Sequence, residues 1–411
     1  MKEEIIKIEK FDHQGRGIGK INDRIVFVPY SIPGDEVKIK IVKEKKNYCE
    51  AVVIDYIKKD SKHIKNDCPY YKICGGCDLR HINYEEQLNF KENKVKEIIK
   101  KFSHLENIKF NNIIPSENQN NYRNKISLKV DNKLSLNKKN THEFVEIESC
   151  KLGSKKINEI ISEINTHNLE CIDNVVIRSS YFTDDMMIVF YVKKGYKFDI
   201  NIDNLKEKVK TIVVKEIDRL NIITGDGNIF ERLNNLSFKI SCTSFFQVNS
   251  LQTLNLYNLV LDECKLSGKE MVYDLYCGTG TIGIFLSKYA KKVVGIEINE
   301  EAVKDARENV KLNGINNCEF YSGDVSDFIK VQKEEADVIV VDPPRSGLDN
   351  ITINNIIRLN PKRLIYVSCD PVTLARDLNL LKEKYEICEI TPVDMFPQTF
   401  HVESVCVMER K

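Results

Sequence analysis

The chain has 411 residues, of which 30% are charged and 42% hydrophobic, and its formal net charge is +1. A chain of this length is expected to form about two to four domains. No apolar run approaches the roughly 20 residues that span a bilayer, and residues 1–20 lack the apolar core of a signal peptide. Nothing in these features suggests a membrane-spanning or secreted protein, so we expect a cytoplasmic one. Because disulfides are rare inside cells, we expect its 13 cysteines to be core thiols together with a metal-binding or catalytic set.

The small net charge hides an asymmetry. Residues 1–140 contain 29 Lys and Arg against 20 Asp and Glu, a balance of +9, so the rest of the chain carries −8. A basic front and an acidic rear suit an enzyme that docks on a polyanion through one end. A lysine-rich solvated surface would give the same balance, so charge alone does not establish RNA binding.

Residues 1–58 are expected to form a small β-barrel. Turn signals such as Pro33-Gly34 separate predicted strands at residues 4–12, 17–22, 24–30, 36–45 and 48–58. Several short strands at this spacing are typical of barrels that bind oligonucleotides. The motif GRGIGK, followed by VPYSIPGD, resembles the TRAM domain of RNA-modifying enzymes, and a generic small barrel is the alternative.

Residues 59–240 are expected to form a central α+β domain. A helix is predicted from about Tyr84 to Phe102. Beyond Tyr122, strands such as KISLKV (125–130) and MMIVFYV (186–192) alternate with short helices.

Four cysteines of this region are candidate metal ligands. Cys68, Cys74 and Cys77 form C-x5-C-x2-C, and Cys150 follows, with Cys171 as a possible substitute. Four thiolates can bind zinc or a 4Fe–4S cluster, and this spacing is unlike the paired C-x2-C of structural zinc. Cations near the motif could also contact RNA phosphates: Lys62, Lys65, Lys72 and Arg80.

Residues 241–411 are expected to contain a doubly wound parallel sheet. From about Glu270, strands at 271–277, 291–298, 318–324, 336–344 and 363–369 alternate with helices. Such alternation indicates right-handed β-α-β crossovers. The last two strands, at 385–397 and 403–410, should form an antiparallel hairpin at the sheet edge.

A nucleoside cofactor is predicted at the first crossover. Gly278, Gly280 and Gly283 have G-x-G-x-x-G spacing after a strand, and Glu297 ends the next strand, where a carboxylate can bind a ribose diol. Dinucleotides and S-adenosylmethionine both use this geometry.

Three features favour S-adenosylmethionine. Asp274 could meet the ammonium of a methionyl group, and Asp324 could lie near an adenine. The terminal hairpin resembles the reversed seventh strand of the class I methyltransferase sheet. Turn capping is the alternative role for both carboxylates.

The fourth and fifth strands are followed by reactive side chains. Asp342 begins DPPR, where Arg345 replaces the aromatic residue of amine methyltransferases and leaves room for carbon chemistry. Methylation of pyrimidine C5 requires a thiolate that adds to C6 and a general base that removes the C5 proton. Cys369, at the end of a strand, and Glu403, at the start of the last one, are the candidates, and His401 is a rival base. Cys277 is expected to pack behind the glycines.

Taken together, DLYCGTG, DPPR, SCDP and DMFPQTxHVE resemble the RNA uracil-C5-methyltransferase family, and with the barrel the resemblance covers essentially the whole chain. It implies that Cys369 is the nucleophile and Glu403 the base. It also implies four contacts to S-adenosylmethionine, from Gln247, Tyr276, Glu297 and Asp342. Gln247 lies in FFQVN, which by itself predicts an ordinary buried strand.

The C-x5-C-x2-C motif resembles the iron–sulfur branch of this family, which modifies 23S rRNA. We therefore expect a TRAM-like barrel at 1–58, a central cluster-bearing α+β domain at 59–240 and a class I methyltransferase domain at 241–411. The expected product is 5-methyluridine in 23S rRNA, with no membrane and no obligate protein partner. The alternatives are a tRNA methyltransferase, an NAD-dependent oxidoreductase on the same glycine loop, and a non-catalytic RNA-binding ribosome-assembly factor.

Overall fold

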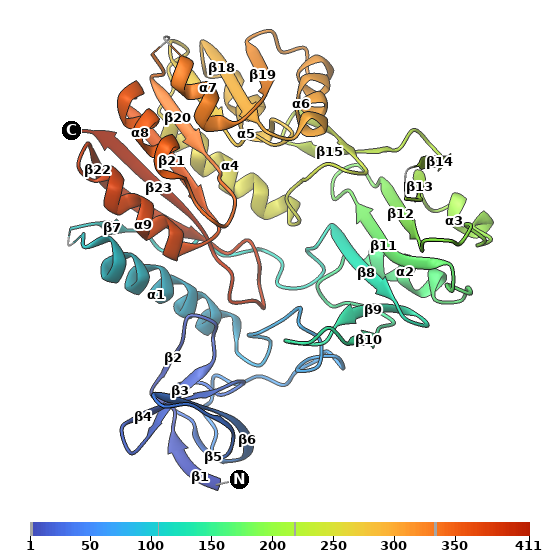
Figure 1. Cartoon of the computed structure of the whole chain (residues 1–411), viewed down its shortest axis with the longest axis vertical. Coiled ribbons are helices and arrows are strands. Elements are labelled where there is room, and N and C mark those ends of the chain that lie inside the picture. The colour runs from blue at the N-terminus through green and yellow to red at the C-terminus, as the bar shows by residue number, and fades with distance from the viewer. Residues whose placement is uncertain (1–2, 106, 218, 333–334) are drawn as a thin grey trace. The chain divides into compact units, whose positions relative to one another are not determined.

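The computed structural model describes residues 3–105, 107–217, 219–332 and 335–411. The chain forms two compact units (Figure 1). The first unit contains the residues up to Lys94 together with Asn137–Val145 and Phe396–His401. The second contains Val95–Leu136, Glu146–Met395 and Val402–Lys411. Helix α1 (Tyr84–Ser103), as predicted, begins in the first unit and ends in the second.

The first unit contains a six-stranded sheet in the order β1-β5-β6-β4-β3-β2. Its strands are β1 (Glu3–Lys7), β2 (Lys10–Phe11), β3 (Gly17–Ile21), β4 (Arg24–Val28), β5 (Glu36–Glu44) and β6 (Tyr48–Lys58). The first predicted strand is split: β1 pairs with β5, whereas β2 pairs with β3, and the Glu9 amide donates to Ile18 O (2.8 Å). Both edges of the sheet thus belong to one stretch of chain, which curls the sheet around a core that includes Val26, Val37 and Ile39.

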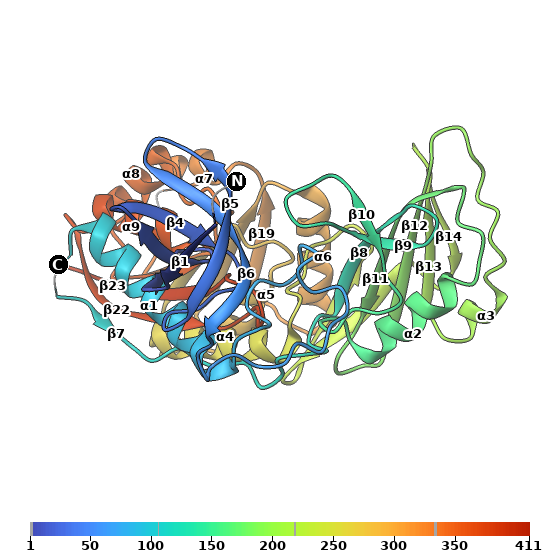
Figure 2. The ribbon, with the colours of Figure 1, turned by 90° about the horizontal axis from the view of Figure 1, so that it is seen from below.

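A mixed seven-stranded sheet, in the order β10-β9-β8-β11-β12-β13-β14, dominates the middle of the chain. The strands are β8 (Lys125–Val130), β9 (Leu134–Asn137), β10 (Phe144–Glu146), β11 (Ile172–Ser179), β12 (Met186–Val192), β13 (Thr211–Lys215) and β14 (Leu220–Thr224). Helices α2 (Lys155–Ile164) and α3 (Asp203–Lys206) lie on one face of it (Figure 2). The predicted α+β character is therefore confirmed. A hairpin of β15 (Asn228–Leu233) and β16 (Leu236–Ser241) follows.

The last sheet of the second unit has the order β19-β18-β17-β20-β21-β23-β22-β7. Its strands are β7 (Lys109–Phe110), β17 (Met271–Leu275), β18 (Lys292–Glu297), β19 (Cys318–Ser322), β20 (Val338–Val341), β21 (Arg363–Ser368), β22 (Tyr385–Val393) and β23 (Glu403–Arg410). Strands β17 to β21 are parallel, and β23 runs antiparallel to both of its neighbours. The prediction of a hairpin at the sheet edge was wrong in one respect, because β7 adds a short parallel strand outside β22.

Helices cover both faces of this sheet. Contacts join α4 (Ser250–Cys264), α5 (Thr281–Ser287) and α6 (Glu300–Leu312) in one row, and α7 (Val325–Val331), α8 (Asn350–Leu359) and α9 (Pro371–Leu381) in another. Strands covered on both faces read as unbroken apolar runs, and β20 and β21 are buried throughout. The doubly wound α/β fold is confirmed.

Candidate active site

The predicted site residues of four strands lie at one edge of the doubly wound sheet. Leu275 pairs with Ile296 and with Val341, and Val341 pairs with Tyr366, so neighbouring parallel strands end together. Tyr276, Glu297, Asp342 and Cys369 stand at or directly after these ends. The carboxyl edge of an open α/β sheet is where such folds bind ligands.

Cys369 and Glu403 lie at the same end of the β21–β23 strand pair. Ser368 pairs with Ser404, Cys369 directly follows Ser368, and Glu403 directly precedes Ser404. Cys369 is half-buried and Glu403 is 5% exposed. Burial, followed by the charges of Glu403 and Asp342, raises the pKa of the Cys369 thiol to about 12.

Burial also raises the pKa of both carboxyl groups beside this thiol. The pKa of Glu403 rises to about 8, through burial and then the charge of Asp342, while the Arg345 guanidinium opposes the shift. The pKa of Asp342 rises to about 7 through burial. Burial disfavours the ionised form of a carboxyl group, and a cationic ligand bound nearby would stabilise that ionised form. Arg345, which the sequence singled out only as a departure from the motif of amine methyltransferases, is therefore also part of the electrostatics of this site.

The glycine loop is held by two carboxylates. The Gly278 amide donates to Glu297 Oε2 (3.1 Å), and the Gly283 amide donates to Asp274 Oδ2 (2.8 Å). Gly278 has φ of +53°, and a Cβ built there would meet no atom within 4 Å, so the backbone is open to a ligand on that side. Asp274 is fully buried, its pKa is raised to about 7 by burial, and its Oδ1 has no hydrogen-bond partner within the described ranges.

These observations fit a nucleoside ligand that carries positive charge. Glu297 lies beside the open glycine loop, as a ribose-binding carboxylate would, and Asp274 has an oxygen to spare for a donor. Asp324 instead caps α7, because its Oδ1 accepts from the amides of Ser326 and Asp327 (2.8 and 3.1 Å). Cys277 is buried, which raises the pKa of its thiol well above the usual value, in line with the packing role expected for it.

Tyr276 and Gln247 occupy irregular backbone. Tyr276 has φ of +64°, a left-handed conformation that is unusual for a bulky residue, and its hydroxyl forms a hydrogen bond with the side chain of Thr352. The expectation that FFQVN forms a buried strand was wrong. Residues 242–249 form a loop between β16 and α4, in which Phe245 is 63% exposed.

Asn124 anchors the loop that carries Gln247. Its side-chain amide donates to Gln247 O and to Ser250 Oγ (both 2.9 Å), and its main-chain amide donates to Val248 O (2.8 Å). At the other end of the loop, buried Arg178 donates to Ser244 O. A loop fixed by non-local side chains has no local periodicity, which is why sequence reasoning missed Asn124.

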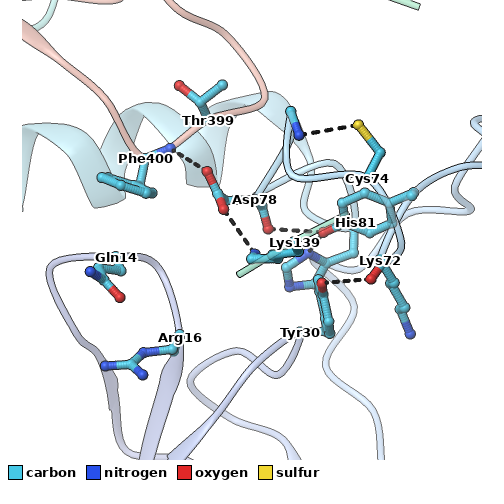
Figure 3. A network of polar contacts seen from close by, with 12 residues as sticks. Gln14, Arg16, Tyr30, Lys72, Cys74, Asp78, His81, Lys139, Thr399 and Phe400 are labelled. Atoms are coloured by element: carbon cyan, nitrogen blue, oxygen red, sulfur yellow. Dashed lines mark hydrogen bonds and ion pairs between the residues drawn. The ribbon is translucent and has the colours of Figure 1, made fainter. Parts of the chain in front are cut away.

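The predicted metal ligands do not form a recognisable metal site. Within residues 3–105, 107–217, 219–332 and 335–411, no group of three or more His, Cys, Asp or Glu is arranged to hold a metal ion. Cys68, Cys74 and Cys77 belong to the first unit, whereas Cys150 belongs to the second. The Cys74 sulfur accepts a hydrogen bond from the Gly76 amide (3.3 Å; Figure 3). The expected 4Fe–4S cluster is therefore not supported by the structure.

The cations beside the cysteine motif differ in their availability. Arg80 is 2% exposed and donates to Asp67 (2.9 Å). The expectation that it contacts an RNA phosphate was therefore wrong. Lys62 pairs with Glu86. Lys72 is exposed and lies 5.1 Å from the centre of the Tyr30 ring. Its exposed charge remains compatible with RNA binding.

The comparisons with known proteins agree with this geometry. The strand order and the residues at the strand ends define a class I S-adenosylmethionine-dependent methyltransferase fold. Residues 83–411 match the tRNA (uracil-5-)-methyltransferase family, and residues 2–54 match the TRAM domain. The chain belongs to the tRNA (uracil-5-)-methyltransferase family.

Relatives extend over the full length of the chain. An uncharacterized RNA methyltransferase of Clostridium acetobutylicum is 37% identical over 98% of this chain and 96% of its own. One of Staphylococcus aureus is 34% identical over 97% and 96%. The crystal structure of Pyrococcus abyssi tRNA (uracil-54, C5)-methyltransferase in complex with S-adenosyl-L-homocysteine is 28% identical, with a TM-score of 0.80 over 99% of this chain and all of that one. The protein is thus an RNA methyltransferase. No helix in the described ranges is both long and apolar enough to cross a membrane.

Proposed function

We propose that this enzyme forms 5-methyluridine in 23S ribosomal RNA, in the cytoplasm, with Cys369 as nucleophile and Glu403 as general base. The observation that supports this most directly is that a thiol and a buried carboxyl, whose charge acts on that thiol, lie at the same end of β21 and β23, at the ligand-binding edge of the sheet. In this proposal residues 1–58 bind RNA, residues 59–240 form the central domain, and residues 241–411 carry the chemistry.

Cys369 begins the reaction. Its sulfur adds to C6 of a uracil that has left the base stack, which makes C5 nucleophilic. The thiol must lose its proton as it adds, because its pKa is about 12; the ionised carboxylate of Asp342, whose pKa is about 7, would take this proton, which leaves Glu403 free for the later step. S-adenosylmethionine supplies the methyl group that C5 takes.

Glu403 completes the reaction. Its carboxylate removes the C5 proton, and the electrons of that bond expel the Cys369 thiolate from C6. A pKa of about 8 gives Glu403 a basicity suited to proton transfer near neutral pH. His401, the rival base, is half-buried and lies against the Phe400 ring, with the ring centres 4.3 Å apart.

Four residues would hold the cofactor. Glu297 would bind the ribose diol beside the glycine loop, and Tyr276, Gln247 and Asp342 would contact the rest of the molecule. The half-buried carboxyl of Asp342 suits a site for a positively charged sulfonium centre.

The choice of RNA depends on two different observations. The C-x5-C-x2-C motif favours 23S rRNA through its resemblance to the iron–sulfur branch of the family. The whole-chain similarity to a tRNA (uracil-54, C5)-methyltransferase favours tRNA as the second candidate. Methylation of unmodified 23S rRNA and tRNA transcripts by the purified enzyme, followed by nucleoside analysis, distinguishes the two.

The 4Fe–4S cluster remains a proposal from cysteine spacing alone. Protein purified without oxygen is expected to contain about four iron atoms and to show broad visible absorption. Cys68→Ser should lose both signals. Iron-free protein with full activity would contradict this part of the proposal.

A trapping assay tests the covalent mechanism. With S-adenosylmethionine and RNA substituted with 5-fluorouridine, fluorine cannot leave C5 as a proton does, so a protein–RNA adduct should persist on a denaturing gel. Cys369→Ala should form none. Absence of the wild-type adduct on both RNAs, with cofactor binding demonstrated, would contradict the mechanism.

A further inference from the structure

The segment Phe396–His401 lies between β22 and β23 and leads directly to Glu403. Its main-chain carbonyls are held at alternate residues. Phe396 O accepts from Lys91 Nζ (2.9 Å), Gln398 O from the amides of Asp78 and Leu79 (2.8 and 2.9 Å), and Phe400 O from Lys94 Nζ (2.9 Å). All of these groups belong to the first unit.

Gln87 of α1 forms hydrogen bonds with the centre of this segment. Its Oε1 accepts from the Gln398 amide (3.0 Å), and its Nε2 donates to Gln398 Oε1 (3.2 Å) and to Ile82 O (2.9 Å). Gln398 has φ of +70°, a costly conformation for a residue other than glycine. The paired amides therefore stabilise a backbone shape that the segment alone would not favour.

Lys91, one helical turn after Gln87, is fully buried, as is Gln87 itself. Burying an ammonium group is costly unless it is hydrogen-bonded, and its bond to Phe396 O offsets part of that cost. A helix position whose only task was to fill the core would favour an apolar residue. The buried polar pair indicates that the shape of the segment matters.

Asp78 also holds the segment through its side chain. Its Oδ2 accepts a long hydrogen bond from the Phe400 amide (3.5 Å), while its Oδ1 accepts from Lys139 Nζ (2.9 Å; Figure 3). The segment is thus held along its length up to Phe400, three residues before Glu403.

We propose that Gln87 and Lys91 are positioning residues for Glu403, and this inference depends on the proposed base role of Glu403. Only His401 and Val402 separate the last held carbonyl from Glu403, and three residues of extended chain reach about 10 Å at most. Proton removal from C5 needs the carboxylate within hydrogen-bond distance. Loosening the segment should therefore slow this step and leave thiol addition and methyl transfer in place.

The test uses Gln87→Leu, Gln87→Glu and Lys91→Met in the full-length enzyme. Each is incubated with labelled S-adenosylmethionine and the transcript that the wild-type enzyme methylates better. Because the C6–sulfur bond breaks only after the C5 proton leaves, methylated RNA should remain attached to Cys369. We expect turnover to fall about 10- to 100-fold, with accumulation of labelled adduct on a denaturing gel and an unchanged single-turnover rate of label transfer to the RNA.

Glu403→Gln is the positive control and should accumulate the same adduct. Asn89→Ala and Lys100→Met, on the exposed face of α1, should behave as wild type. Gln87→Glu keeps the size and one acceptor oxygen, so it provides the test where Gln87→Leu does not fold.

Two results would overturn the inference and leave the proposed function intact. One is wild-type turnover in Gln87→Glu and Lys91→Met. The other is slow turnover in both without adduct, while Glu403→Gln accumulates it. If Glu403→Gln itself accumulates no methylated adduct, the base role fails and the positioning role falls with it.

Discussion

Cys369 directly follows, and Glu403 directly precedes, the Ser368–Ser404 pair that joins β21 to β23, so the thiol and the carboxyl lie at the same end of these two strands. Burial raises the pKa of the thiol to about 12 and that of the carboxyl to about 8. Both groups are therefore predominantly protonated at neutral pH in this structure. The reaction proposed for this pair requires each to lose its proton, so the rate and the stability of the enzyme should both depend on pH.

The methylation rate should rise with pH. Glu403 acts as a base only when ionised, and its pKa is about 8, so the single-turnover rate should increase between about pH 6 and 9. Single-turnover assays with labelled cofactor that count only methylated RNA released from the protein measure this directly, because release follows removal of the C5 proton. A rate that is flat or falls over this range would contradict the assignment.

Removing the carboxyl should stabilise the fold at high pH. Because the pKa of Glu403 is about 8 in the folded protein against 4.5 for the free group, the folded state binds more protons between these values. The wild type therefore loses stability as the pH rises through this window. Gln at position 403 cannot titrate, so the melting temperature of Glu403→Gln should exceed that of the wild type at about pH 8.5, and the two should differ less at about pH 5. An equal difference at both pH values would count against this.

Cys369→Ala should abolish methylation without preventing cofactor binding. Loss of a nucleophile costs about three orders of magnitude or more in rate. Calorimetry with S-adenosylmethionine should show near wild-type affinity. Cys388→Ser, a half-buried thiol of β22, is the matched control and should retain activity.

Glu297→Gln should weaken cofactor binding. The carboxylate accepts from the Gly278 amide, and charge-assisted hydrogen bonds contribute about 1.5–3 kcal/mol. The KM for S-adenosylmethionine should rise about 10- to 100-fold, with a smaller change in kcat. Glu301→Gln, in the first turn of α6, changes an exposed carboxylate and should have no such effect.

Asn124→Ala should raise the KM for S-adenosylmethionine, as Gln247→Ala should, but by a smaller factor. Its side chain holds Gln247 O and Ser250 Oγ, and an ordinary hydrogen bond contributes about 1 kcal/mol. The KM for the cofactor should rise about 3- to 10-fold. Asn174→Ala, on β11, is the control. An unchanged KM in Asn124→Ala would show that the loop holds its shape without this anchor.

Local pattern in the sequence was enough to predict much of this molecule. Strands β17 to β21 were placed from apolar runs bounded by turn residues, and α1 from its periodicity. The same runs end at Glu297, Asp342 and Cys369, and strand ends of an open α/β sheet meet at one edge. The site residues on the parallel strands can therefore be grouped from the sequence alone.

The tertiary structure decided the features that depend on contacts between residues far apart in the sequence. The loop form of residues 242–249, the burial of Arg80 and the addition of β7 outside β22 all depend on such contacts. Gln87 and Gln398 bond across 311 residues of sequence, and neither amide alone predicts the other. Helix and strand periodicity arises from residues that are neighbours in sequence, so the sequence by itself determined the helices, the strands and the reactive residues at the strand ends. The contacts that hold the loops and the Phe396–His401 segment in place arise only when distant segments pack together, so the tertiary structure alone determined them.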